Sequence, residues 1–349
     1  MKRQRDDAAR IDAALASPSP WRRAWEDLRA NRPAFVALAF LALVAIGSLF
    51  APLLPLPSPI ALDLRDEPLA PIAPWTSFIV HGFEPEYWNL SAVDEALVAL
   101  RRAIFGDLQT AAWLGTDSKG RDLLSRIVWG SRTSLAVGML ATLTSLLVGV
   151  TWGAVAGLVG GRVDQILMRI VDALYSLPFI FVVIFLITVI DGWREELAAT
   201  IGLERESIFY VTIGLFYWLT MARVVRGQVL QLKNSEFIAA ARLAGARTPW
   251  LVRVHVLPNV LGIVIVYLTL SIPSILLFES FLSFLGLGIE APKVSWGLLA
   301  VDGADAINPL GLDWWLVIGP AAAMGSVLLA LNVLGDGLRD ALDPKGGRG

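Results

Sequence analysis

Two glycines and the charged residues after them form the first pattern in this chain that could do chemistry. Gly115 and Gly120 are followed by Arg121 and Asp122, a spacing that superficially resembles a phosphate-binding loop. Such a loop needs a lysine and then a serine or threonine at a strand-to-helix turn, so that amide and ammonium groups surround the phosphate and the hydroxyl binds magnesium. Here Asp122 would repel phosphate, and no strand is expected before the glycines. The pattern therefore does not predict ATP binding by this chain.

The charged residues of the same segment are better explained as an ionic cluster. Asp117, Arg121, Asp122 and Arg126 follow one another closely and alternate in sign. We expect them to be solvated or to pair with one another where the chain enters the membrane.

Other kinds of catalytic site lack the residues they would need. The sequence contains no cysteine, which excludes disulfides, iron–sulfur clusters and thiolate zinc sites. His81 and His255 are the only histidines, too few and too far apart for a histidine-based metal centre. The patterns HExxH and GxSxG are both absent. We expect no catalytic residue, no metal site and no cofactor on this chain, which fits a conduit.

A polar stretch, residues 234–259, lies between two uncharged runs of membrane length and is the most informative part of the chain. It is expected to form two short helices. Ser235 can cap the first helix and Gly245 ends it. Pro249 can occupy the first position of the second helix, and Pro258 is expected to stop it.

Small residues dominate the first of these helices. They are Ala239, Ala240, Ala241 and Ala244, and three arginines surround them, Arg242, Arg247 and Arg253. A surface of alanine and glycine lets another backbone approach closely. We therefore interpret the 234–259 segment as a docking site for a second protein.

The elements that must position this segment are membrane helices. Hydrophobic residues make up 56% of the chain and the mean hydropathy is +0.63, which predicts a polytopic membrane protein. Six uncharged runs can cross the roughly 30 Å of hydrocarbon in a bilayer. They are Ala34–Leu54, Thr133–Gly161, Ala173–Ile190, Ser207–Ala222, Val256–Phe278 and Trp314–Gly335. We predict an all-α fold with six transmembrane helices and both ends on one side.

Positive charge marks the side on which the ends lie. Lysines and arginines concentrate before the first run, in the 162–169 link, in residues 223–255 and at the C-terminus, whereas the 191–206 loop is acidic. By the positive-inside rule, both termini and the 234–259 segment are cytoplasmic. The first apolar run is too long and begins too late for a cleavable signal peptide.

These signals divide the chain into five regions. They are a cytoplasmic tail (1–33), the first transmembrane helix (34–54), an extracytoplasmic insert (55–131), a five-helix core (132–337) that includes the 234–259 segment, and a cytoplasmic tail (338–349). Residues 20–31 should form an interfacial helix with Trp21, Trp25 and Leu28 on one face. A second helix, Ser91–Phe105, should turn its apolar face to the rest of the protein or to lipid, or else receive a partner. Residues 280–313 should form a helix-loop or re-entrant element covered by protein.

Glycines spaced four apart lie on one face of the second predicted span. They are Gly149, Gly153, Gly157 and Gly161. This spacing lets helices approach to backbone contact. Packing inside one subunit is the favoured interpretation, and a face against a partner subunit is the alternative.

Two ionisable residues lie near the ends of predicted spans, Asp172 and Glu279. Such residues are candidates for contact with a transported solute. Hydration, or pairing with Arg169 or a partner, is the simpler explanation.

Four motifs in order resemble the ABC-importer permeases of the dipeptide, oligopeptide and nickel group. They are Leu114–Gly138, AAR-LAG with HVLPN inside the 234–259 segment, SFLGLG with SWG inside Phe281–Gly297, and Asn332–Pro344. The chain is similar to the second, C-type permease subunit of peptide importers. It departs from the pattern at Ala239, where a glutamate usually opens the coupling motif, and in residues 55–113, which are longer than is usual.

The resemblance implies a MetI-like permease core in a bacterial inner membrane. The implied partners are a second permease subunit, two ATPase subunits that bind ATP and magnesium, an extracytoplasmic binding protein and the lipid bilayer, with no nucleic acid. The residues expected to couple to an ATPase are Glu236, Ala240, Ala241, Arg242, Gly245, Ala246, Leu257 and Pro258. The residues of an entrance motif on the extracytoplasmic side are Gly115, Asp117, Gly120, Arg121 and Asp122.

The expected function is therefore one half of the path through an ATP-driven importer, most simply for di- or oligopeptides. Relatives with these motifs also move nickel or glutathione. A secondary transporter is the alternative from another class. It would be expected to show inverted repeats and a polar, discontinuous helix pair at the midplane, and neither is evident in the sequence.

Overall fold

The computed structural model describes residues 20–62, 70–71, 78–80, 90–106, 108–110, 112–193, 205–308 and 311–342. The basic residues before residue 20, most of the acidic 191–206 loop and the C-terminal tail lie outside this part. The described residues are mainly helical, which confirms the predicted all-α class. Two short antiparallel pairs accompany the helices, β1 (Phe78–Val80) with β2 (Leu108–Thr110) and β3 (Ile307–Asn308) with β4 (Gly311–Leu312).

Four helical stretches in the described residues are long and apolar enough to cross a membrane. The first is α3 (Arg32–Leu49), and the second joins α5 (Leu123–Thr144) through a π turn to α6 (Val150–Val159). The others are α13 (Leu257–Phe284), with the π turn before it, and α15 (Trp314–Leu342). These stretches correspond to the first, second, fifth and sixth predicted spans.

The third predicted span is broken. Helices α7 (Gly161–Ser176) and α8 (Phe179–Asp191) meet at 86° and would raise the number of spans to five if they form one broken span. Pro178 causes the break, because it has no N–H to donate and it disfavours the helical conformation at Leu177. Leu177 is accordingly extended, with ψ of 136°. The prediction of one uninterrupted helix from Ala173 to Ile190 is wrong.

The fourth predicted span is part of a longer helix. Helix α10 runs from Arg205 to Lys233 and does not end at Ala222. Its charged half stays helical because Arg223 and Arg226 find carboxylates on α7: Arg223 donates to Asp172 at 2.8 Å and Arg226 donates to Asp164 at 2.7 Å. Asp172 therefore pairs with Arg223, and the expected pairing with Arg169 is not observed.

Gly149, at the end of the π turn before α6, and Gly153 and Gly157 of α6 face α10 of the same chain. A Cβ on Gly153 would meet the carbonyl oxygen of Ala222, and the other close approaches are Gly149 to Met221 and Gly157 to Val229. Gly161 departs from the prediction because α6 ends at Val159; Gly161, with φ of +59°, begins α7, and a Cβ there would have open space.

This packing predicts a specific sensitivity to one methyl group. Gly153→Ala should destabilise the protein by about 1–3 kcal/mol, because α6 and α10 would have to separate. Gly227→Ala is the matched control on α10, where a Cβ has open space, and it should be neutral or stabilising by up to about 1 kcal/mol. Thermal unfolding in detergent measures both, and equal melting temperatures would contradict the packing.

Helix α14 (Trp296–Asp305) packs among α5, α13 and α15, which agrees with an element covered by protein. Glu279 of α13 contacts the start of α14. The Glu279 side chain is fully buried and accepts hydrogen bonds from Ser283 at 3.1 Å and from Ser295 at 2.7 Å. Contrary to expectation, Glu279 is buried and makes no ion pair among the described residues; Oε1 accepts both serine hydrogen bonds, and Oε2 has no hydrogen-bond partner there.

The two predicted amphipathic helices are oriented differently. In α2 (Pro20–Ala30), Leu28 is buried against α15, whereas Trp21 and Trp25 are about half exposed. In α4 (Ala92–Phe105), the polar side faces inward, since Arg101 is 1% exposed and Asp94 forms an ion pair. Three apolar residues of α4, Val93, Leu100 and Ile104, are exposed among the described residues, whereas Leu97 is partly buried.

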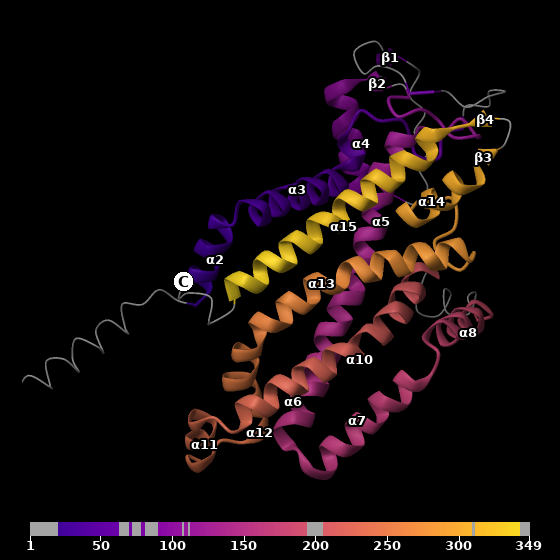
Figure 1. Ribbon diagram of the computed structural model, residues 1–349. Coiled ribbons are helices and arrows are strands. Elements are labelled where there is room, and N and C mark those ends of the chain that lie inside the picture. Colours follow the sequence, from indigo (N-terminus) through magenta and orange to yellow (C-terminus); the bar gives the residue numbers. More distant parts are fainter. Residues whose placement is uncertain are drawn as a thin grey trace, which may run out of the picture.

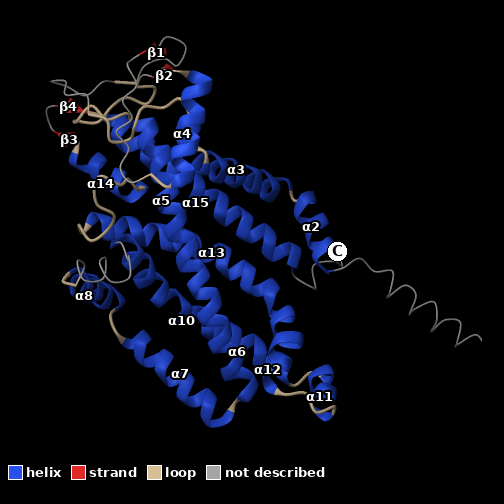
Figure 2. Cartoon of the chain, turned by 180° about the vertical axis from the view of Figure 1, so that it is seen from behind, coloured by secondary structure: helices blue, strands red, loops and turns tan. Residues whose placement is uncertain are grey.

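The insert and the 234–259 segment lie at opposite ends of the molecule. Helices α3, α10, α13 and α15 run along a common diagonal, with α4, α14 and the strands at one end (Figure 1). Helices α11 (Glu236–Leu243) and α12 (Thr248–Leu251) lie at the other end, and the reverse view agrees (Figure 2). This arrangement separates the two candidate functional ends by the length of the bundle.

Candidate functional sites

The 234–259 segment forms two short helices around a glycine. Helix α11 ends at Leu243, and the chain turns at Gly245, whose φ of +86° strongly favours glycine. Ser235 stands at the N-cap of α11, but its hydroxyl donates to the Leu232 carbonyl at 2.6 Å and does not cap the helix. Gly245 thus sets the angle between α12 and the preceding helices α10 and α11.

Pro258 does not stop the second helix, contrary to expectation. The chain continues from α12 through a π turn (Val252–Val256) directly into α13, with Pro258 in the first turn of that helix. The wider π turn leaves room for the proline ring and for a residue without an N–H, which an α turn would not. The segment is therefore joined to α13 without a flexible link.

The segment is held to the rest of the protein by burial and by one of its own cations, Arg242, beside which Lys233 of α10 makes a similar contact. Ile238 and Leu251 are at most 2% exposed and pack in one core cluster with residues of α6, α10 and α13. Arg242 donates to the carbonyl of Leu158 at 3.3 Å, and Lys233 donates to that of Val159 at the same distance. Because the last carbonyls of α6 have no partner within their helix, cations at this end stabilise it.

An exposed apolar side chain missed in the sequence stands at the end of α11. Leu243 is 91% exposed, the highest exposure among the large apolar residues described. Elsewhere in the segment, the rings of Phe237 and Trp250 flank His255 with centroid distances of 5.8 and 5.1 Å. We call Leu243, Phe237, Trp250 and the partly buried His255 the exposed face.

The predicted coupling residues are divided between this surface and the interior. Exposed side chains or positions are Glu236, Ala240, Arg242, Gly245 and Pro258, and partly buried ones are Ala241, Ala246 and Leu257. The structure thus brings the set into one segment, with the alanines nearest the core turned inward.

The entrance motif is a buried ionic network and not a solvated one. Asp117 accepts hydrogen bonds from Arg121 and from Arg126, each at 2.7 Å. Arg126, which is 1% exposed, also donates to Asp302 of α14 at 2.8 Å. Sequence reasoning missed Asp302 because it lies far along the chain. The network joins the start of α5 to α14.

The backbone of the entrance motif is a tight turn. Gly115 and Gly120 have φ of +82° and +73°, and Thr116 bridges to Asp122 across the turn. Trp315 of α15 donates its indole N–H to the Thr116 carbonyl at 3.1 Å. The turn is thereby fixed to the start of α15.

Asp122 has a different role from Asp117, the other carboxylate of the motif. It caps α5 by accepting from the Ser125 amide at 2.7 Å and makes no ion pair among the described residues. Burial raises the pKa of Asp122 to about 6 from 3.8, although hydrogen bonds from backbone amides oppose that shift.

This pKa predicts a pH dependence of stability. The folded state binds the proton more tightly than the unfolded state, so stability is greatest below about pH 4 and falls as the pH rises to about 6, by about 3 kcal/mol. Asp122→Asn should remove this component and keep the cap. Denaturation midpoints between pH 4 and 7 test the prediction; parallel curves for both proteins would contradict it.

Comparison with known proteins identifies what these elements belong to. The family described as "Binding-protein-dependent transport system inner membrane component" matches residues 149–347, more than half of the chain, including α6 through α15 and the 234–259 segment. The chain belongs to this family. A second family, the N-terminal TM domain of oligopeptide transport permease C, matches residues 19–71 and so covers α2 and α3.

Three relatives show how far the similarity extends. The oligopeptide transport system permease protein OppC of Escherichia coli (strain K12) is 40% identical over 93% of this chain and 92% of its own length. The dipeptide permease DppC of Bacillus subtilis (strain 168) is 47% identical over 67% and 68%, and the di/tripeptide permease DppC of Pseudomonas aeruginosa (strain UCBPP-PA14) is 32% identical over 97% of each chain. A solved structure, an inward-facing form of the MetNI methionine ABC transporter, has a TM-score of 0.49 and 17% identity, over 63% of this chain and 98% of that chain.

Family membership states the broad function. The chain is a multi-pass inner-membrane permease subunit of an ABC importer, a transport component and not an enzyme, and it works with an ATPase and a binding protein. The discontinuous helix α7–α8, which was not expected from the sequence, is thus a feature of a permease and does not favour the secondary transporter.

Proposed function

We propose that this permease subunit forms half of a path for di- or oligopeptides delivered by an extracytoplasmic binding protein. The names of the three relatives support this substrate class, since all three are described as peptide permeases. The other half of the path comes from a second permease subunit, and each permease contacts one of two ATPase subunits.

The proposed coupling site is the 234–259 segment, and its construction is the observation that supports this role. A segment that transmits movement must be stiff and must present a compact face to its driver. In this segment Ile238 and Leu251 are buried, no flexible link precedes α13, and Leu243 is exposed. ATP-driven closure of the two ATPases would move it as a rigid body and switch the helix bundle between two packings.

The proposed orientation places both termini and the 234–259 segment in the cytoplasm, with α4 and α14 on the opposite side. Arginines of the segment support it, because positively charged loops stay in the cytoplasm. The entrance motif lies with α14 on the extracytoplasmic side, near where a binding protein would release its cargo.

A reconstituted complex tests the function. The permease is purified in mild detergent with its ATPase and partner permease, reconstituted into liposomes, and assayed for ATP hydrolysis and for uptake with the binding protein loaded with a tripeptide, with nickel or with glutathione. We expect the loaded peptide to stimulate hydrolysis, since coupling between the two faces must be reciprocal. If only nickel or only glutathione stimulated hydrolysis, that solute would take the place of peptides as the proposed substrate. Uptake without any ATPase would overturn the proposal.

A further inference from the structure

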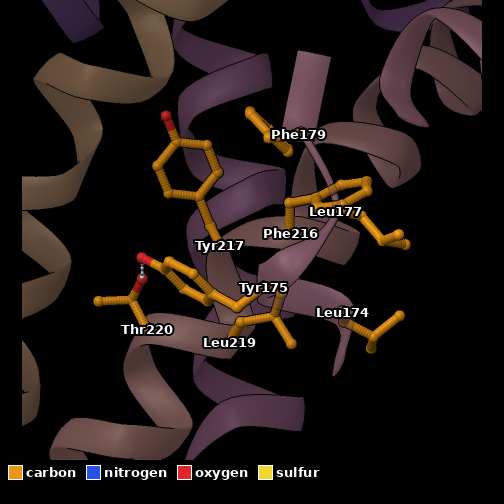
Figure 3. Close-up of a pocket in the computed structure, with 8 residues that line it drawn as sticks. All are labelled: Leu174, Tyr175, Leu177, Phe179, Phe216, Tyr217, Leu219 and Thr220. Carbon is orange, nitrogen blue, oxygen red and sulfur yellow. Dashed lines mark hydrogen bonds between the residues drawn. The ribbon is translucent and has the colours of Figure 1, made fainter. Parts of the chain in front are cut away.

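A cavity of about 340 Å³ lies beside the break between α7 and α8 (Figure 3). Phe179, just after the break, and Phe216 and Tyr217 of α10 supply aromatic walls. The Phe179 ring packs against Phe216 with a centroid distance of 4.4 Å and against Phe278 of α13 at 4.6 Å. The walls are therefore held in place by packing between three helices.

The mouth of the cavity is polar. Tyr175 and Thr220 are both exposed, and their hydroxyl oxygens are 3.3 Å apart (Figure 3). The guanidinium of Arg223 lies 4.1 Å from the centre of the Tyr175 ring and donates to Asp172 at 2.8 Å. A positive and a negative group thus lie next to an aromatic hollow.

These groups indicate that the mouth opens on water and not on lipid. Arg223 directly follows the uncharged part of α10, which ends at Ala222. The side chains of Arg223 and Asp172 are 41% and 65% exposed, and charged groups next to a predicted span face water, the protein interior or a water-filled cavity. The extended backbone at Leu177 must likewise face the protein interior or a water-filled cavity.

We propose that this cavity is a transient binding site for an apolar or aromatic side chain of the peptide in transit, an inference that rests on the proposed function. The volume is at the small end of ligand sites and suits one side chain better than a whole peptide. Arg223 and Asp172 can exchange their mutual contact for the carboxylate and the amine of a peptide. A lipid chain offers neither of these polar groups.

A cavity-filling variant and its control test the site in the complete importer. Leu174 lines the cavity, whereas Ile170 lies one turn earlier on the same helix, is similarly exposed and does not line it. Leu174→Trp should lower ATP-driven uptake of Ala-Phe-Ala relative to Ala-Ala-Ala by about tenfold, because the tryptophan occupies the hollow. Ile170→Trp should leave the ratio of the two uptake rates unchanged.

Cysteine labelling supplies a second measurement, since the chain has no native cysteine. Leu177→Cys, at the mouth, should react with a water-soluble maleimide in the complex, and Ala-Phe-Ala with ATP should slow that reaction. Ile170→Cys is the control and should not be protected. An unchanged uptake ratio together with no protection would overturn the site, while continued ATP-driven uptake of Ala-Ala-Ala would leave the proposed function standing. If the wild-type importer moves neither peptide, both fall.

Discussion

Replacing Leu243 with aspartate is expected to uncouple the permease from its ATPase, lowering ATP hydrolysis stimulated by the loaded binding protein by about 30-fold. Leu243 is 91% exposed, so the change costs the isolated subunit nothing in packing. In the assembled importer the same side chain would meet the ATPase, where burying an unpaired carboxylate costs at least about 2 kcal/mol, the size of an interface hot spot. Hydrolysis by the purified complex, and retention of the ATPase during purification, measure the effect.

Leu243→Met is the matched control, because it keeps an apolar side chain of similar size. It should retain near-normal stimulation. This pair is a sharper test than changes at Gly245 or Ala241: Gly245 has φ of +86°, which strains any other residue, and Ala241 packs partly against the core. Normal stimulation in Leu243→Asp would remove the exposed face from the coupling site.

Replacing Arg126 with alanine is expected to destabilise the protein by about 3–5 kcal/mol, the usual cost of removing one partner of a buried ion pair. Arg126 is 1% exposed and bridges Asp117, at 2.7 Å, and Asp302, at 2.8 Å. Its loss leaves Asp302 with a distant contact to Arg121 at 3.5 Å and leaves Asp117 one partner short. The melting temperature of the purified permease in detergent should fall accordingly.

Arg132→Ala is the control on the same helix. Arg132 donates to Asp94 at 2.7 Å, but its side chain is 28% exposed, so its loss should cost about 1 kcal/mol or less. A double change, Arg126→Met with Asp302→Asn, should cost less than the sum of the two single changes, because Asp302→Asn removes a carboxylate that Arg126→Met would leave without its partner. Equal destabilisation by Arg126→Ala and Arg132→Ala would show that the network is not holding α5 to α14.

The network also has a consequence for the movement of α14. Helix α14 is held at its start by Glu279 and along its length by Arg126, two contacts from different membrane helices. An element fixed at two points moves with its supports. We therefore expect α14 to follow α5 and α13 as a unit when the bundle changes conformation.

Much of this molecule could be predicted from local sequence. Membrane helices follow from uncharged runs, because hydrocarbon requires every backbone polar group to be satisfied within its own helix. The helix Ser91–Phe105 follows from its periodicity, and the turn at Gly245 from the conformational freedom of glycine. The order of four motifs was enough to predict the family that the comparisons then showed.

Which charged residues pair with one another, and which side chains are exposed, could be learned only from the tertiary structure. Asp302 joins Arg126, and Arg223 joins Asp172, across distances along the chain that no local pattern spans. Pro258 is compatible with a continuing helix only because a π turn precedes it. The sequence does not distinguish Leu243 from any other leucine in a helix, and only the structure shows that it is exposed. The sequence by itself determined which segments are helical and membrane-bound, since hydration and backbone hydrogen bonding act locally. Only the packing of helices against one another decided which side chains meet, because a buried charge takes its partner from whatever the fold brings beside it.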